Sequence, residues 1–555
     1  MELILPGTIF SRIAWYLDFF ILGLLILEVV SEVRSSRSMK SYVMQNAPSF
    51  TFIVIFVLLF IYTKSLDITA AGTRFEGISR GVIILRNVFI ILKVFSRIKK
   101  VSAFFESITM QPAQTILLSF LLVIFSGSLI LMLPFTTVAE GGLHFLDALF
   151  TSTSAVCVTG LIVVDTATYF TIWGQIVILA LIQVGGLSIM VISFFTLFSI
   201  HQKVSFQDKL MLSYALNENN ISLLKRRLRV IILSTFIIEA IGSLILLYPF
   251  YQVSSDWQQA LLLSVFHSVS AFCNAGFSLF TTSLEGFLGN PLVNLTIALL
   301  IIAGGISFGV LSDFFRIARL RIKSLIRTVS GAREVVSLNT YVVVIITPVL
   351  IVAGIFLIYG LEHANSLAEL RTGQQYLAAF FQSVTLRTAG FNTIPIGSLT
   401  TTTLLVMMPF MFIGAASGST AGGIKINNLA VMYGYLKSIL VNRDTVILRR
   451  SSLSRTQINK AFLVFFFGIF SITSGTIILS ATEHGELVEI MFEVVSAFGT
   501  VGLSTGITSS LTYLGKTVII VLMFIGRLGP LTILAAASHP EQSVQISYPR
   551  GNVQL

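Results

Sequence analysis

Cysteine and histidine are scarce in this chain of 555 residues, which has 2 cysteines and 6 histidines. Cys157 and Cys273 alone supply neither a disulfide framework nor a thiolate metal site. A membrane enzyme would need His, Asp, Glu or Cys clustered in its apolar segments, and among the histidines only His267 lies inside a short apolar run and not at its edge. No glycine-rich phosphate-binding motif occurs either. We therefore expect neither an enzyme nor a cofactor bound by this chain.

Charged residues are scarce as well, and this scarcity indicates the class of protein. They make up 11% of the chain, and hydrophobic residues make up 55%. Soluble domains carry about 25% charged residues, so the composition predicts an integral membrane protein with room for about ten or more spans. The net charge of +11 could suggest nucleic acid. The basic residues cluster between apolar runs, however, which indicates a lipid bilayer and no nucleic-acid partner.

Four similar stretches, each with a glycine near its end, recur along the chain. Their sequences are TSTSAVCVTGL (151–161), SVSAFCNAGFS (268–278), QSVTLRTAGFNT (382–393) and SAFGTVGLSTG (496–506). Gly160, Gly276, Gly390 and Gly502 lie 116, 114 and 112 residues apart, which is the signature of an internal repeat. An apolar run of about half a bilayer's length precedes each glycine, and longer apolar runs flank it. The pattern predicts an all-α integral membrane protein with four tandem repeats of span, pore loop and span.

The boundaries of these repeats follow from the apolar runs. We expect about three transmembrane helices in an N-terminal extension (1–110), pore repeats at 111–203, 228–330, 338–437 and 456–538, and a tail at 539–555. The expected spans are 114–133 and 172–200, 230–250 and 292–317, 341–359 and 400–436, and 458–480 and 517–537. The expected half-spans are 144–156, 257–272, 375–384 and 487–498, and the extension has candidates at 13–33, 49–62 and 82–94.

Basic residues predict the orientation of the chain. They gather in the three linkers between repeats, at 203–229, 316–333 and 437–460. Because cytoplasmic loops carry the excess of Lys and Arg, all three linkers should be cytoplasmic, and the glycine loops should open to the outside. The same rule places the N-terminus outside and the C-terminus in the cytoplasm of a multi-pass protein.

The glycine loops can bind a cation through their backbone. Non-helical backbone at membrane depth must be buried or line a watery path, and four converging loops can pool their carbonyl oxygens there. A monovalent cation that loses its hydration shell needs such a ring of carbonyls. Glycine permits the required backbone angles, and each preceding short helix points its partially negative end at the centre. The candidate ion-binding residues are Val158, Thr159, Gly160, Asn274, Ala275, Gly276, Thr388, Ala389, Gly390, Thr500, Val501 and Gly502.

Three side chains beside the loops have structural explanations. Cys157 and Cys273 stand three residues before their glycines and are expected to pack behind the loops as small residues. Arg387 occupies the same place in the third loop. We expect a carboxylate or carbonyl partner for it, in preference to a role in permeation.

A gate is expected below the loops. The stretch GAASGSTAGG consists of ten small or polar residues inside an apolar run that is too long for one straight span: Gly414, Ala415, Ala416, Ser417, Gly418, Ser419, Thr420, Ala421, Gly422 and Gly423. Such a break is tolerated only where it lines a cavity, so it predicts a mobile intramembrane loop. Arg527 lies deep in the last span, where it is either a positive barrier in the pore or the partner of a carboxylate such as Glu489 or Glu493.

The motifs resemble those of a known family. The loops VTGL, CNAGF, RTAGF and TVGL, with IQVGGLSIM (182–190) and GSTAGGIK (418–425), are similar to the bacterial Ktr/Trk potassium transporters, which are related to the plant HKT transporters. The resemblance extends from about residue 111 to 537. It implies a single chain that imitates a tetrameric potassium channel, with K⁺ held by filter carbonyls on a pseudo-fourfold axis and with the same gating loop and pore arginine. The N-terminal extension resembles extra helices of some Trk members.

The resemblance also implies substrate and partners. A serine in the first filter loop accompanies sodium transport in the family, and Gly160 stands there in this chain, which favours potassium. The implied assembly is a homodimer in the bacterial cytoplasmic membrane, each subunit with its own pore. A separate ring of KTN/RCK-type subunits would bind any regulatory nucleotide, and the basic linkers and the tail are plausible docking surfaces for it.

Two alternatives remain beside an electrochemically driven potassium pathway. A sodium-permeable or sodium-coupled transporter of the same superfamily fits the same motifs. A secondary transporter of another fold would show inverted repeats and buried carboxylates, whereas these repeats run in one direction and their loops lack carboxylates.

Overall fold

The computed structural model describes residues 112–138, 142–187, 224–314, 316–317, 337–443, 445–449 and 451–537. The helices expected at 1–110 and the tail at 539–555 lie outside these residues. Regular structure in the described part is almost entirely helical. One small antiparallel sheet pairs β1 (Ile447–Leu448) with β2 (Ser451–Ser452).

Four helices of the described part are long and apolar enough to cross a membrane. They are α5 (Pro112–Leu131), α11 (Leu224–Ser254), α15 (Leu338–Glu362) and α19 (Arg455–Thr482). A helix pairs its own backbone N–H and C=O groups, for which hydrocarbon offers no hydrogen-bond partners. Their outward faces carry exposed apolar side chains such as Phe125, Phe356 and Phe470. The described residues therefore have the helices of a multi-pass membrane protein.

A shorter helix follows each of these four and packs against it. The short helices are α6 (Phe145–Val156), α12 (Trp257–Phe272), α16 (Thr372–Thr385) and α20 (Leu487–Gly499). At the start of α12, the Asp256 carboxylate accepts hydrogen bonds from the backbone N–H groups of Gln258 and Gln259, which fixes where that helix begins. The C-terminal ends of the short helices are buried, whereas the surfaces of the long helices are largely exposed.

A third set of helices completes the bundle, and several of its members are interrupted. These are α8 (Ile172–Leu187), α13 (Pro291–Gly305), α17 (Thr401–Phe412), α18 (Ile426–Leu440), α21 (Tyr513–Leu528) and α22 (Pro530–Ala537). Short elements connect the others: α7 (Thr166–Tyr169), η1 (Pro134–Thr136), η3 (Glu285–Phe287), η4 (Ile396–Ser398) and η5 (Ile507–Ser510).

Two of the expected spans are bent. The run 292–317 bends by 105° between Pro291–Gly305 and Phe308–Phe314, and the run 517–537 bends by 95° between α21 and α22. In the second case Gly529, with a φ of 79°, and Pro530 stop the helix. The run 400–436 is also interrupted, between α17 and α18, where the break was expected. Of the run 172–200, the structure describes the helix as far as Leu187.

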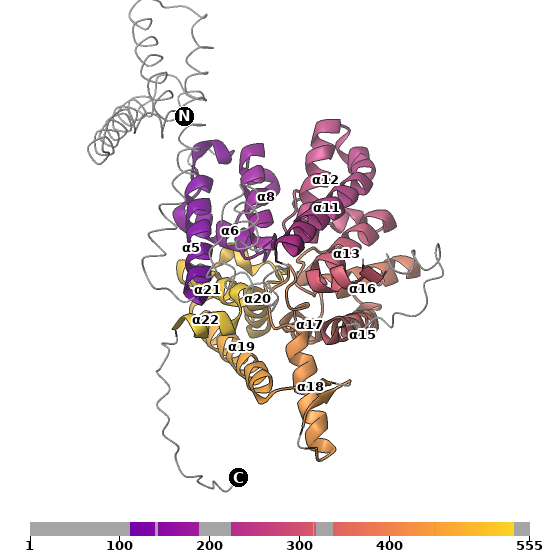
Figure 1. The fold of residues 1–555 in the computed structure, drawn as a ribbon. Helices are drawn as coiled ribbons and strands as arrows, with labels where there is room; N and C mark the ends of the chain where they lie inside the picture. Colours follow the sequence, from indigo (N-terminus) through magenta and orange to yellow (C-terminus); the bar gives the residue numbers. More distant parts are fainter. Residues whose placement is uncertain are drawn as a thin grey trace, which may run out of the picture. The chain divides into compact units, whose positions relative to one another are not determined.

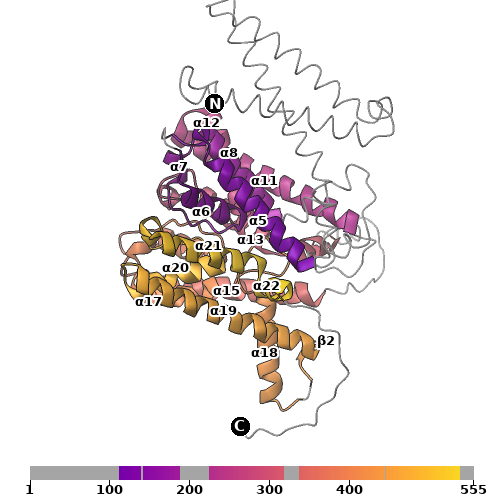
Figure 2. The same ribbon diagram turned by 90° about the vertical axis from the view of Figure 1, so that its left-hand side faces the viewer.

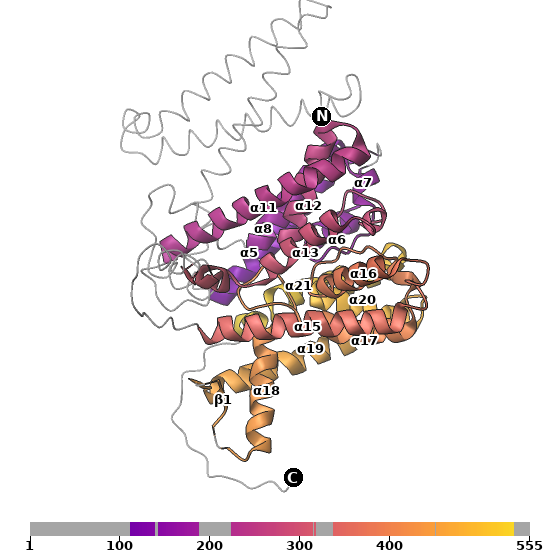
Figure 3. The same cartoon turned by 90° about the vertical axis from the view of Figure 1, so that its right-hand side faces the viewer.

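Figure 1 shows how these helices gather within the described part of the chain. The indigo helices α5, α6 and α8, the magenta helices α11–α13, the coral helices α15–α17, the orange helix α19 and the yellow helices α20–α22 lie around the segments that follow the short helices. In Figure 2, α20 and α21 lie on the same side of α19, and α18 leaves the group. The small sheet lies beside the middle of α18, where Leu448 of β1 is next to Gly434. Figure 3 views the same helices from the other side, with α15 and α17 towards the viewer. In this view too, α18 points away from the other helices. This arrangement brings the ends of the short helices together in the interior.

Candidate functional site

The four glycine loops adopt the same left-handed backbone conformation. Gly160, Gly276, Gly390 and Gly502 have φ values of 94°, 71°, 81° and 90°. The residue two positions before each glycine also has a positive φ, as seen at Val158, Asn274, Thr388 and Thr500. Such angles are rare for residues with a side chain and cost energy there. The repeated conformation indicates that the loops share one structural task.

The short helices hold the loops through their final turns. The N–H groups of Thr159, Ala275 and Val501 donate to the carbonyls of Ser154, Ser270 and Ser496 at 2.8, 2.7 and 2.8 Å. The hydroxyls of these serines bond the same loops again: Ser154 Oγ accepts from Gly160 N at 3.0 Å, Ser496 Oγ accepts from Gly502 N at 3.1 Å, and Ser270 Oγ donates to Phe277 O at 2.8 Å. Because the N–H groups point back at the helices, the loop carbonyls are left for other partners.

The four loops meet as a ring of backbone atoms, which we call the glycine ring. A Cβ placed on any of its glycines would collide with two groups of a neighbouring loop. These are the glycine of that loop and the carbonyl of the residue before it. The neighbours are Ala275 and Gly276 for Gly160, Ala389 and Gly390 for Gly276, Val501 and Gly502 for Gly390, and Thr159 and Gly160 for Gly502. The contacts run in sequence order and close from the last loop to the first. All twelve residues predicted to bind an ion therefore lie in one cluster, and nearly all are buried.

Glycines in the third set of helices allow close packing beneath the ring. A Cβ at Gly185, Gly304 or Gly526 would collide with the carbonyl at the end of a short helix, at Val156, Phe272 or Phe498 respectively. Gly414 differs, because its neighbour is Gly422 within its own interhelical segment. The helices α8, α13 and α21 therefore pack directly against the short helices that hold the ring. The helix α17 ends just before Gly414, at the interhelical segment.

We expect Gly304→Ala to destabilise the protein, because the Phe272 carbonyl occupies the space of the new methyl group. Overpacking of this kind costs about 1–3 kcal/mol, which should lower the melting temperature in detergent by several degrees. Gly360→Ala is the matched control. Gly360 is also in a helix, α15, but a Cβ there would have no neighbour within 4 Å, so its melting temperature should stay the same or rise. An equal effect of both substitutions would contradict this explanation.

The segment 414–423, predicted as a gate, lies against the ring and is tied to two helix ends. A Cβ at Gly423 would stand 3.1 Å from Gly499 O, next to the fourth loop. Within the segment, Ala416 N and Thr420 N donate to Gly305 O and Gly304 O, each at 3.2 Å, and Gly423 N donates to Gly526 O at 3.3 Å. These bonds explain how non-helical backbone is tolerated inside the bundle: its polar groups find partners at the ends of α13 and α21.

Arg527 joins this segment to another helix. Its Nη1 donates to the Thr420 carbonyl and its Nη2 donates to the Gly185 carbonyl, so one guanidinium bridges loop 414–423 and α8. Lys425 is close by and donates to the carbonyls of Ala421 and Gly422. A planar guanidinium is well suited to two separate acceptors at fixed positions. Two cationic side chains therefore lie at the level of the loop, each satisfied by backbone oxygens.

The carboxylates considered as partners of Arg527 are used elsewhere. Glu489 accepts a hydrogen bond from Glu486 N at the start of its own helix, and Glu493 accepts one from the Thr508 hydroxyl. The alternative of a pair with either residue is therefore wrong for this structure.

Arg387 has a carbonyl partner, and the two cysteines are buried, as expected. Arg387 is buried, and its Nη1 donates to Thr347 O at 3.3 Å, a carbonyl partner. It lines a cavity of about 10 Å³ with Thr347, Val384 and Ala415, just large enough for one water molecule. Cys157 and Cys273 are free thiols and fully buried.

A polar pair beneath the loop was not singled out from the sequence. Asn427 Nδ2 donates to Asn339 Oδ1 at 2.6 Å, and Asn427 Oδ1 accepts from Ser417 N at 3.4 Å. The sequence held one signal, since two consecutive asparagines, Asn427 and Asn428, follow GGIKI at the start of an apolar helix. The partner of Asn427 lies 88 residues away and could not be identified from spacing.

Apolar helices around a buried ring of backbone carbonyls define a helical membrane protein of the kind that moves ions. The sequence pattern of one family, described as TrkH, cation transport protein, matches residues 83–546. The chain therefore belongs to the TrkH cation transport family. Its relatives are transport proteins and not enzymes.

Individual relatives agree with this family. The chain is 39% identical over 447 residues to Ktr system potassium uptake protein B of Bacillus subtilis (strain 168), covering 80% of this chain and 96% of that one. It is 38% identical over 440 residues to the protein of the same description from Vibrio alginolyticus, covering 79% and 93%. The fold is similar to the crystal structure of the potassium transporter TrkH from Vibrio parahaemolyticus, with a TM-score of 0.62 at 16% identity, covering 88% and 98%.

Proposed function

We propose that this protein takes up potassium across the bacterial cytoplasmic membrane, through a selectivity filter made by the glycine ring. The observation that carries the proposal is the closed order of contacts among the four loops, in which each glycine faces the carbonyl of the next loop. A ring of carbonyl oxygens can replace the hydration shell of a monovalent cation. Two relatives described as potassium uptake proteins support potassium as the substrate.

The architecture proposed for this function is four tandem repeats of span, pore loop and span around a pseudo-fourfold axis. The order of long helix, short helix, glycine loop and further helix in the described residues supports it. The repeats would begin near residues 111, 228, 338 and 456, after an N-terminal extension of about three spans. The basic linkers support a cytoplasmic C-terminus and glycine loops that open outside.

The uptake needs no chemical step in this chain. An inside-negative potential supplies about 2.3 kcal/mol per charge per 100 mV, which is enough to accumulate a monovalent cation. We propose that loop 414–423 gates this flow and that Arg527 is a positive barrier beneath the filter. The bonds from the loop to Gly304, Gly305, Gly526 and Arg527 support a defined resting position from which the loop moves.

The proposed assembly is a homodimer with a cytoplasmic ring of KTN/RCK-type subunits, which would bind the regulatory nucleotide. The description of two relatives as protein B of a Ktr system supports a multi-component system.

The test is uptake into proteoliposomes. We expect the purified protein to take up rubidium, and external potassium to inhibit this uptake more strongly than external sodium does. Gly160→Ser should weaken that preference. A serine at Gly160 would meet Ala275 O and would have to hold a φ of 94°. Absence of cation uptake by the wild-type protein would overturn the proposed function, and unchanged selectivity in Gly160→Ser would overturn the filter.

Sodium transport is the second candidate. It is favoured by a relative described as potassium/sodium uptake protein NtpJ of Enterococcus hirae (strain ATCC 9790), which is 34% identical over 456 residues. Uptake of ²²Na⁺ measured against ⁸⁶Rb⁺ in the same vesicles decides between the two.

A further inference from the structure

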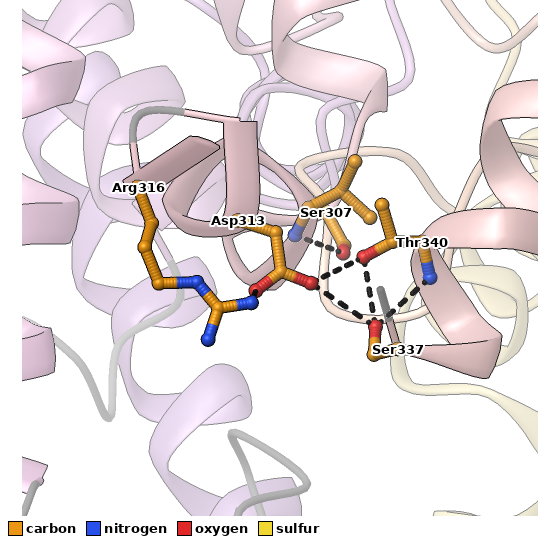
Figure 4. Close-up of polar contacts among 6 residues, drawn as sticks. Ser307, Asp313, Arg316, Ser337 and Thr340 are labelled. Carbon is orange, nitrogen blue, oxygen red and sulfur yellow. Dashed lines mark hydrogen bonds and ion pairs between the residues drawn. The ribbon is translucent and has the colours of Figure 1, made fainter. Parts of the chain in front are cut away.

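The bend after α13 is fixed to the start of α15 by one carboxylate. Asp313 lies in the short helix Phe308–Phe314, and its Oδ2 accepts hydrogen bonds from Thr340 Oγ1 at 2.6 Å and from Ser337 Oγ at 3.2 Å (Figure 4). Its other oxygen lies 3.1 Å from Arg316 Nη2. Ser337 is the N-cap of α15, so the carboxylate sits at the partially positive end of that helix, where a negative charge is favourable. Asp313 therefore anchors the short helix to α15.

The anchored helix reaches loop 414–423 directly. At its first residue, Phe308 N donates to Gly418 O at 3.2 Å. Two residues later, Val310 packs with Val343 of α15 and Ala416 of the loop in a small buried cluster. The loop thus touches both members of the anchored pair, and it does so through backbone and apolar contacts.

A side-chain route joins the same two elements to the loop. Asn339 in the first turn of α15 donates to Ser307 Oγ at 3.4 Å and accepts from Asn427 Nδ2 at 2.6 Å. Asn427 in the first turn of α18 accepts in turn from Ser417 N of the loop at 3.4 Å. The two asparagines therefore connect the bend, the start of α15 and the middle of the loop.

We propose that Asn427, held by Asn339, is a positioning residue for loop 414–423, and that Asp313 anchors this pair by fixing the bend to α15. The inference rests on the proposed role of the loop as a gate. Because these bonds are made with the loop in its observed place against the ring, a loop that moves away must break them. These bonds therefore contribute to the free-energy difference between the two positions of the loop, and they do not involve the filter residues.

The proposal predicts how the two asparagines respond to substitution. A hydrogen bond contributes about 1 kcal/mol net, so Asn427→Ala and Asn339→Ala should each raise rubidium uptake about fivefold. The double variant should exceed either single variant only slightly, because both remove the same contact. Asn339→Asp should remain near wild type, since its carboxylate can accept from Asn427 Nδ2 and from the Ser307 hydroxyl. The preference for potassium over sodium should stay unchanged in all of them.

The control is Asn428→Ala. Asn428 is the same residue type in the same turn of α18 and is half-buried like Asn427, and its side chain makes no hydrogen bond within the described part of the chain. Uptake by this variant should equal that of wild type, and all variants should elute from size exclusion as the wild type does. If Asn428→Ala raises uptake as much as Asn427→Ala, or if the single effects simply multiply in the double variant, the proposal is overturned.

Arg527→Ala, measured in the same series, separates two kinds of failure. Raised uptake in Arg527→Ala with wild-type uptake in Asn427→Ala would overturn the positioning role and leave the gate standing. Wild-type uptake in both variants would overturn the proposed gate itself, and with it this inference. Raised uptake in both variants, with Asn428→Ala unchanged, is the expected result.

Discussion

Gly390→Ala should abolish most of the cation uptake while leaving the helices folded. A Cβ at Gly390 would stand 2.6 Å from Val501 O, 3.0 Å from Gly276 Cα and 3.3 Å from Gly502 Cα, so it contacts two other loops of the ring. The residue would also have to keep a φ of 81°. Strain of this kind costs about 1–3 kcal/mol, and any relief moves the carbonyls that we propose contact the ion. A cost of that size at the filter corresponds to about a ten- to hundredfold loss of uptake.

Gly506→Ala separates the two causes of that loss. Gly506 has a φ of 112°, so alanine is strained there too, but a Cβ would have no neighbour within 4 Å. Rubidium flux into proteoliposomes should therefore fall sharply for Gly390→Ala and only slightly for Gly506→Ala. Equal losses in the two variants would mean that backbone strain alone, and not the crowding of the ring, explains the requirement for glycine.

Much of the local structure could be predicted from the sequence because its signals are local. The short helix expected at 257–272 begins and ends at those residues in α12, since Asp256 supplies the N-cap and the chain turns to a left-handed residue at Asn274. The four glycines share positive φ values because the sequence repeats the same loop. Aligning the loops was enough to identify the twelve residues of the ring as one candidate set.

The remaining features depend on partners that are distant in sequence. The run 292–317 has no proline to mark its bend, and the structure ties the bend to other segments through Thr420 N, which donates to Gly304 O, and Phe308 N, which donates to Gly418 O. The partners of Arg527 are backbone carbonyls, which every residue has, so a search of the sequence for carboxylates could not find them. The pairing of Asn339 with Asn427 likewise follows from how α15 and α18 pack.

Arg527→Ala should raise uptake about tenfold. Two unit charges about 4 Å apart repel by about 4 kcal/mol at an effective dielectric constant near 20, and a part of that acts on a cation below the filter. The same substitution releases the Thr420 and Gly185 carbonyls from their bridge, which frees loop 414–423 from α8. Both effects act in the same direction. Initial rates of rubidium uptake in proteoliposomes measure the change, and unchanged rates in a well-folded variant would contradict the barrier and the bridge together.

Arg527→Lys distinguishes the charge from the bridge. Lysine keeps the positive charge but replaces the planar fork with a single ammonium group, which does not match two fixed carbonyls as the guanidinium does. If the charge is the main barrier, the lysine variant stays near the wild-type rate. If the bridge to Thr420 holds the loop closed, the lysine variant conducts nearly as fast as the alanine variant. Lys425 already supplies a cation beside the same loop, but Arg527 also provides the bridge to α8, which Lys425 does not. We therefore expect the lysine variant to be faster than wild type.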